Sequence, residues 1–91
     1  MFSTYWDGWG SGTFDIRFPF GPGTINRHSR VVCSISELGA PPNGPLDYPF
    51  FGSANMQILN IAPTDSGDVF VRININWGST LQWRVTFFIE S

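Results

Sequence analysis

The sequence contains no lysine and a single cysteine, and only 13% of its residues are charged. An average globular protein has roughly 25% charged residues. A monomer of this composition would therefore leave an unusual amount of apolar area in water. One cysteine excludes an intrachain disulfide, and the apolar neighbours of Cys33 predict a buried structural thiol. We expect the chain to be stabilised by self-association rather than by covalent cross-links.

Clustered positive charge and long apolar runs are also missing. Five arginines are scattered along a chain of formal net charge −2, whereas nucleic acids are bound by concentrated Lys and Arg. No stretch approaches the ~20 apolar residues of a membrane span, and the first residues lack the basic and apolar regions of a signal peptide. We expect a soluble protein without its own signal peptide, and neither nucleic-acid binding nor membrane insertion.

Helical periodicity is absent as well. No window of eleven or more residues repeats apolar positions every 3.6 residues, and 10 glycines and 7 prolines interrupt the chain. Alternation with a period of two instead predicts strands over residues 13–20, 31–38, 56–62, 69–75 and 81–89. A short N-terminal strand would be the sixth. We predict one domain over residues 1–91, an all-β, compact antiparallel six-stranded β-sandwich.

The last two runs have the strongest alternation. One face of the first carries Val69, Val71, Ile73 and Ile75, and one face of the second carries Leu81, Trp83, Val85, Phe87 and Ile89. A short connection containing Gly78 predicts that the two runs pair as an antiparallel hairpin. Their opposite faces mix Asn, Gln, Thr and Arg with aromatic residues. Such a surface suits contact with a sugar, a sister subunit or both.

The sequence offers few groups for catalysis. His28 is the only histidine, and its polar, arginine-flanked stretch predicts an exposed loop residue rather than a general base. Asp65 and Asp68 flank a Ser-Gly pair, which is typical of a turn, and two carboxylates fall short of the roughly six to eight oxygen ligands of calcium. No nucleotide-binding, nucleophile or metal motif is present. We expect no enzymatic activity, no metal and no cofactor.

Residues 5–12 combine aromatic rings, a carboxylate and glycines. A ring can pack on the apolar face of a pyranose, a carboxylate can accept hydrogen bonds from neighbouring hydroxyls, and glycines would let the backbone approach the ligand. The predicted sugar-binding residues are Asp7, Trp9, Arg72, Asn74 and Trp77. Either Arg72 or Asn74, both from the run 69–75, would reach into this site from the same or an adjacent subunit. Alternatively, Trp6 and Trp9 fill an open end of the sandwich or a subunit seam.

Several segments have the order and spacing of a known lectin family. They are residues 14–18, 31–38 and 56–63, then Phe70, residues 77–80 and the closing strand. In this pattern the chain resembles the H-type lectin domain of snail agglutinins and discoidins over about residues 14–90. The resemblance implies a six-stranded sandwich, trimers or paired trimers, and calcium-independent binding of galactose or N-acetylgalactosamine between subunits. Trp77 matches the tryptophan that introduces the turn into the last strand.

The chain departs from the family pattern at several sugar-contacting positions. Gly78 stands where the snail lectins have histidine, Ser53 falls near their binding arginine, and Trp83 replaces a tyrosine of the closing strand. Asp7 corresponds only loosely to their N-terminal aspartate.

The function predicted from the sequence is therefore a non-catalytic lectin of the galactose or N-acetylgalactosamine type. It would bind glycans multivalently as a homo-oligomer, a trimer or a multiple of one. An alternative remains open, in which the protein is a virus or phage structural or tail-adhesin subunit whose aromatic and neutral polar surfaces serve assembly.

Overall fold

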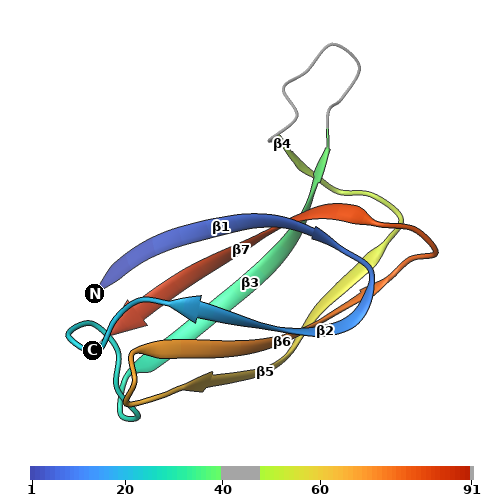
Figure 1. The fold of residues 1–91 in the computed structure, drawn as a ribbon. Helices are drawn as coiled ribbons and strands as arrows, with labels where there is room; N and C mark the ends of the chain where they lie inside the picture. The colour runs from blue at the N-terminus through green and yellow to red at the C-terminus, as the bar shows by residue number, and fades with distance from the viewer. Residues whose placement is uncertain (40–47, 91) are drawn as a thin grey trace.

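In a computed structural model, two antiparallel sheets pack face to face, and no helix occurs in residues 1–39 and 48–90, which the structure describes (Figure 1). Sheet A has the strand order β1-β7-β3-β4, and sheet B has the order β2-β6-β5. The strands are β1 (Phe2–Gly10), β2 (Gly12–Pro19), β3 (Arg30–Gly39), β4 (Tyr48–Phe50), β5 (Asn55–Pro63), β6 (Asp68–Asn76) and β7 (Leu81–Glu90). Six long strands, three in each sheet, confirm the predicted antiparallel sandwich, and the three-residue β4 extends one edge of sheet A.

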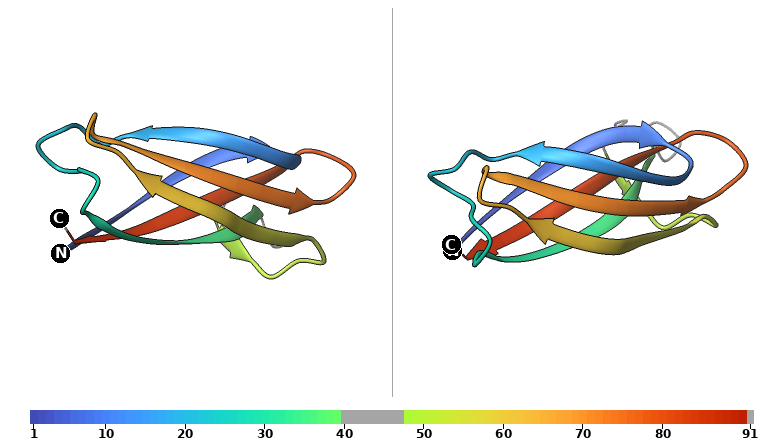
Figure 2. Two further views of the ribbon diagram at one scale, coloured as in Figure 1. Left: turned by 90° about the horizontal axis from the view of Figure 1, so that it is seen from below. Right: turned by 60° about the horizontal axis from the view of Figure 1, so that its bottom comes forward.

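The two strands with the strongest alternation do not pair with each other. β6 lies between β2 and β5 in sheet B, whereas β7 lies between β1 and β3 in sheet A. Residues 77–80 cross from one sheet to the other (Figure 2). The predicted hairpin is therefore wrong. A hairpin would place both apolar faces side by side on one sheet, whereas strands in opposite sheets bury these faces against each other.

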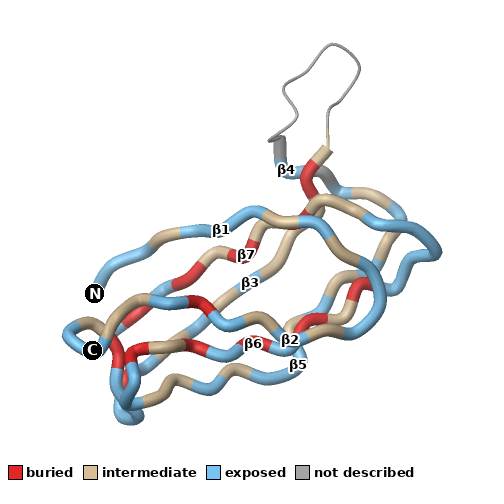
Figure 3. Tube along the Cα trace, viewed as in Figure 1, coloured by how far each residue is buried: buried red, intermediate tan, exposed pale blue. Residues whose placement is uncertain are grey.

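The core lies between the centres of the two sheets. The buried positions follow β6 and β7 in alternation (Figure 3). Its buried members are Phe18, Ile25, Val69, Val71, Ile73, Ile75, Trp83, Val85, Phe87 and Ile89. The Phe87 ring packs on the rings of Phe18 and Phe20, with centroids 4.8 and 5.3 Å apart. Trp6 contacts all three of these rings from β1, so it fills the sandwich, although along edge strand β1 rather than at an open end. Trp9, named in the same alternative, is 66% exposed.

Residues 5–12 form the second half of edge strand β1 and the short connection that crosses from sheet A to the start of β2 in sheet B. The N-terminal strand is confirmed as β1, which pairs with β7 in one unbroken register from Phe2 to Gly10. Gly8 leaves space for the indole of Trp83, and Gly10 leaves space for the ring of Phe14. These two glycines therefore serve packing on the side where a Cβ would lie, and the expectation that they bring the backbone close to a ligand stays a prediction.

Cys33 points toward the core but is only half-buried. β3 pairs with β7 from Arg30 to Glu37, but β4 pairs with β3 only at residues 37–39. Among the residues that the structure describes, the segment around Cys33 therefore pairs with a strand on one side only. The predicted burial is only partly reached, although it raises the pKa of the thiol to about 11.

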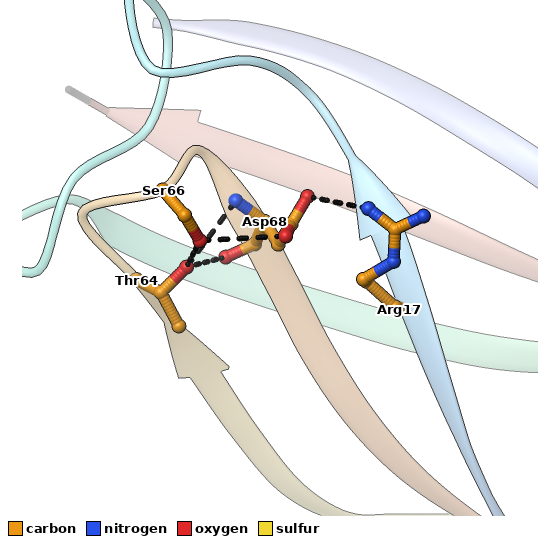
Figure 4. Close-up of polar contacts among 4 residues, drawn as sticks. All are labelled: Arg17, Thr64, Ser66 and Asp68. Carbon is orange, nitrogen blue, oxygen red and sulfur yellow. Dashed lines mark hydrogen bonds and ion pairs between the residues drawn. The ribbon is translucent and has the colours of Figure 1, made fainter.

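The turn between β5 and β6 is held by its own polar side chains (Figure 4). The Thr64 hydroxyl donates to the Asp68 carbonyl oxygen at 2.9 Å, and the Ser66 hydroxyl donates to the Asp68 carboxylate at 3.3 Å. Arg17 of β2 also donates to that carboxylate at 3.1 Å. The prediction that this segment is a turn is confirmed. His28, in the connection between β2 and β3, is exposed as predicted.

Candidate functional site

The structure places the five predicted sugar-binding residues on three different surfaces. Asp7 and Trp9 lie on the outer face of sheet A, in register with residues of β7. Arg72 and Asn74 lie on the outer face of sheet B, and Trp77 lies in the connection between β6 and β7. The two outer faces point in opposite directions (Figure 2). One chain therefore does not bring the five residues together.

Asp7 holds β1 to β7. Its two carboxylate oxygens accept hydrogen bonds from Nε and Nη2 of Arg84 at 2.7 and 3.0 Å. The Arg84 guanidinium carbon also lies 4.1 Å from the centre of the Tyr5 ring, within the range of a cation–π contact. Asp7 and Arg84 are cross-strand neighbours, so their ion pair joins β1 to β7. The carboxylate that was predicted to bind sugar hydroxyls is therefore already hydrogen-bonded to Arg84.

Arg72 and Asn74 are also engaged within the chain. Arg72 donates to both oxygens of Asp15 at 2.8 and 3.3 Å, and this hydrogen bonding lowers the pKa of that carboxyl. The Asn74 amide donates to the Thr13 hydroxyl at 2.8 Å. The ion pair borders a hollow of about 80 Å³ beside Asn60, where the register of β5 shifts. Pockets for small molecules are usually roughly 300–1,000 Å³, so this hollow is small for a sugar.

A larger cavity is lined by residues of the segment before β5 and of the connection between β6 and β7. Both segments lie at the same end of the sandwich (Figure 1). The cavity measures about 410 Å³ and is lined by Glu37, Phe51, Ser53, Trp77 and Leu81 among others. A hollow of about 280 Å³ adjoins it and shares Glu37 and Phe51. We call the two together the end groove. Its volume falls within the usual range for a small-molecule site.

The end groove combines three kinds of chemical group. The Trp77 side chain is 45% exposed and offers an aromatic face. The Glu37 carboxylate accepts no hydrogen bond from any residue that the structure describes, and Ser53 adds an exposed hydroxyl. Leu81 lines the groove and packs against the core. A ring beside a free acceptor and a hydroxyl can bind a ligand with one apolar face and several hydroxyl groups.

Glu37 and Phe51 were not among the predicted residues, and Ser53 was noted only for its position relative to the lectin pattern. One signal for Glu37 is present in the sequence. Val31, Cys33 and Ile35 share the inward face of β3, and Glu37 comes next on that face. A carboxylate that ends an apolar inward series marks the point where the strand leaves the core. No comparable signal points to Phe51, because its contribution depends on how the segment before β5 folds over β3.

Neither a metal cluster nor a membrane-spanning helix is found within residues 1–39 and 48–90. No three of their His, Cys, Asp and Glu side chains are grouped to hold a metal ion. None of their elements is a helix of the length and apolarity needed to cross a bilayer.

No protein-family model matches the chain, and no curated protein or solved structure gives a significant match. The functional inference therefore depends on the geometry of the chain itself.

Proposed function

We propose that the protein is a non-catalytic carbohydrate-binding protein that takes a neutral sugar of the galactose or N-acetylgalactosamine class in the end groove. The observation that carries the proposal is the convergence of Trp77, Glu37 and Ser53 on one open cavity of about 410 Å³. The sugar class follows from the resemblance to H-type lectins.

Each group of the end groove has a defined role in this proposal. The indole of Trp77 packs on the C–H face of the pyranose, and Glu37 accepts hydrogen bonds from two neighbouring hydroxyls. Ser53 donates to or accepts from a third. The single carboxylate disfavours an anionic ligand, because two like charges at this distance repel each other. The proposed ligand is therefore an uncharged sugar.

Binding at an open groove of this kind is expected to be weak for one chain. Multivalency through a homo-oligomer, a trimer or a multiple of one, would strengthen attachment to a glycan surface without any additional contact per site. The earlier expectation that Arg72 or Asn74 reaches a sugar from an adjacent subunit stays a prediction.

The proposal is tested by calorimetric titration of the pure protein with free galactose and N-acetylgalactosamine, after a glycan array has selected the better ligand. Trp77→Ala and Glu37→Gln should each weaken binding by about 1–3 kcal/mol, or roughly 5- to 150-fold. Phe70→Ala and Trp9→Ala are the controls, because they remove exposed aromatic rings from the outer faces of sheets B and A. A monomeric sugar is used so that changes in valency do not alter the measured affinity.

Three outcomes would contradict the proposal. The unmutated protein ignores every neutral glycan, or both groove variants bind as tightly as the unmutated protein, or the loss occurs in a control variant instead. The last result would move the site to the face that carries the affected ring.

A second candidate function is favoured by a different observation. Tyr5, Trp9, Val32 and Phe88 are exposed on the outer face of sheet A. An apolar face of this kind suits a subunit that serves mainly to build a larger assembly, as in the structural or tail-adhesin alternative. Absence of glycan binding together with stable self-association would favour this function.

A further inference from the structure

The outer face of sheet A exposes four large apolar side chains. The exposed fractions are 66% for Trp9, 64% for Val32, 58% for Tyr5 and 48% for Phe88. Val32 and Phe88 are cross-strand neighbours of β3 and β7, and Tyr5 and Trp9 lie along β1. The four side chains therefore extend across three adjacent strands of a single sheet.

The apolar area is large enough for a protein interface. A fully buried aromatic side chain covers roughly 150–250 Å², so Trp9, Tyr5 and Phe88 together with Val32 expose on the order of 400 Å². The largest apolar patch on a typical monomer is roughly 300–600 Å², and a stable interface buries about 800 Å² per partner. The patch would thus supply about half of the area that a dimer requires.

The charges on this face are neutralised within the chain. Asp7 and Arg84 form a two-point ion pair at the centre, and Arg30 pairs with Glu90 at 3.2 Å near one margin. The remaining outward positions are small or uncharged: Ser3, Ser34, Ser36, Gln82 and Thr86. A partner can therefore cover the face without leaving an unpaired charge, and no net charge is present to select a charged partner.

The outer face of sheet B differs in character. Asp15, Arg72, Asn74 and Thr13 form a polar network along β2 and β6. These side chains are paired within the chain, as the charges on sheet A are. Among the described residues, however, this face exposes two large apolar side chains, Leu59 at 50% and Phe70 at 44%, against four on sheet A. The larger exposed apolar area favours sheet A as the covered side.

We propose that the outer face of sheet A packs against the same face of a second copy of this chain, about a two-fold axis. An electrically neutral face with a central apolar patch can pack on a copy of itself, as a two-fold contact requires. Two such faces would lie about 10 Å apart, the usual spacing of packed sheets. The contact produces a dimer, or joins two trimers if a separate interface makes trimers. It leaves the end groove of each chain open and does not depend on what that groove binds.

The structure offers a matched pair of residues for the test. Phe88 is 48% exposed on sheet A, and Phe70 is 44% exposed on sheet B. Sedimentation equilibrium of the full chain should give at least twice the chain mass of 10.2 kDa. Phe88→Lys should halve the particle mass and raise the dissociation constant by about 100-fold or more, because a two-fold interface contains the residue twice. Phe70→Lys should leave the mass unchanged.

Circular dichroism first confirms that each variant retains its β structure. If Phe88→Lys does not fold, Val32→Lys replaces it, since Val32 is on the same face and is 64% exposed. The proposal is overturned if the unmutated protein sediments as a monomer at about 100 µM. It is also overturned if the folded sheet A variant keeps its mass, or if Phe70→Lys dissociates the particle and the sheet A variant does not.

Discussion

At the scale of single residues, the protein shows how a neighbouring strand controls the environment of a side chain. Cys33 has the inward direction of a core residue, but no strand pairs with its free edge among the residues that the structure describes. Water reaches one side of the thiol, while the core covers the other. The result is a half-buried group whose pKa is raised by desolvation to about 11.

This environment predicts slow reaction of the Cys33 thiol in the folded protein. Because its pKa lies about two units above the ordinary value of 9.0, the thiolate fraction near pH 8 is about 100-fold lower than in an unfolded chain. Labelling by a thiol reagent should be slower by about 10-fold or more, because the higher nucleophilicity of a thiolate with a raised pKa offsets part of this loss while the core limits access. Denaturant should abolish the difference. Equal rates with and without denaturant would show that Cys33 is not shielded by the core.

At the scale of elements, two turns differ in whether they have space for a side chain in place of glycine. Gly67, in the turn between β5 and β6, has a φ of +89°, and a Cβ there would collide with the backbone of Gly21 and Pro22. Its carbonyl oxygen also accepts the amides of Phe20 and Gly21 at 3.1 and 2.9 Å. Gly12, between β1 and β2, has a φ of +72° but open space around it.

The two glycines should therefore respond differently to the same substitution. Gly12→Ala should lower the free energy of unfolding by about 1–2 kcal/mol, the cost of a left-handed residue with a side chain. Gly67→Ala should cost about 2–5 kcal/mol, because the backbone collision adds to the same conformational cost. Urea denaturation measures both. Equal losses would mean that the contact between this turn and the connection after β2 is not rigid.

At the scale of the whole molecule, two sheets bury one continuous core. Val69, Val71, Ile73 and Ile75 from sheet B and Val85, Phe87 and Ile89 from sheet A are all at most 1% exposed. No disulfide supports this core, because the sequence has one cysteine. Stability therefore depends on packing between the sheets.

The packing predicts a large effect at Phe87 and a small one at Phe70. Phe87 is fully buried beneath three other aromatic rings, so Phe87→Ala should cost about 3–5 kcal/mol. A domain of this size has a total stability of about 5–15 kcal/mol, so the loss is a substantial part of the whole. Phe70→Ala, on the outer face of sheet B, should change the free energy of unfolding by about 0.5 kcal/mol. Comparable losses in urea denaturation would contradict the assignment of Phe87 to the core.

Local patterns in the sequence determined the type of element and which side chains point inward. Alternation over β2, β3, β6 and β7 follows from the pleat, whose period of two is a property of any strand. β5 departs from strict alternation, because a register shift between Ile58 and Asn60 brings Ile61 to the core side. The scarcity of charge anticipated the apolar outer face of sheet A.

The tertiary structure alone decided which strands are neighbours. Alternation looks the same whether an apolar face meets a strand in its own sheet or one in the opposite sheet, so β6 and β7 could not be assigned to different sheets from their sequences. The same ambiguity affected the candidate site. Asp7, Arg72 and Trp77 each had suitable chemistry, but their distribution over three surfaces depends on the order of strands. Glu37, Ser53 and Trp77 line the same groove for a similar reason, because the groove is formed by segments far apart in the chain.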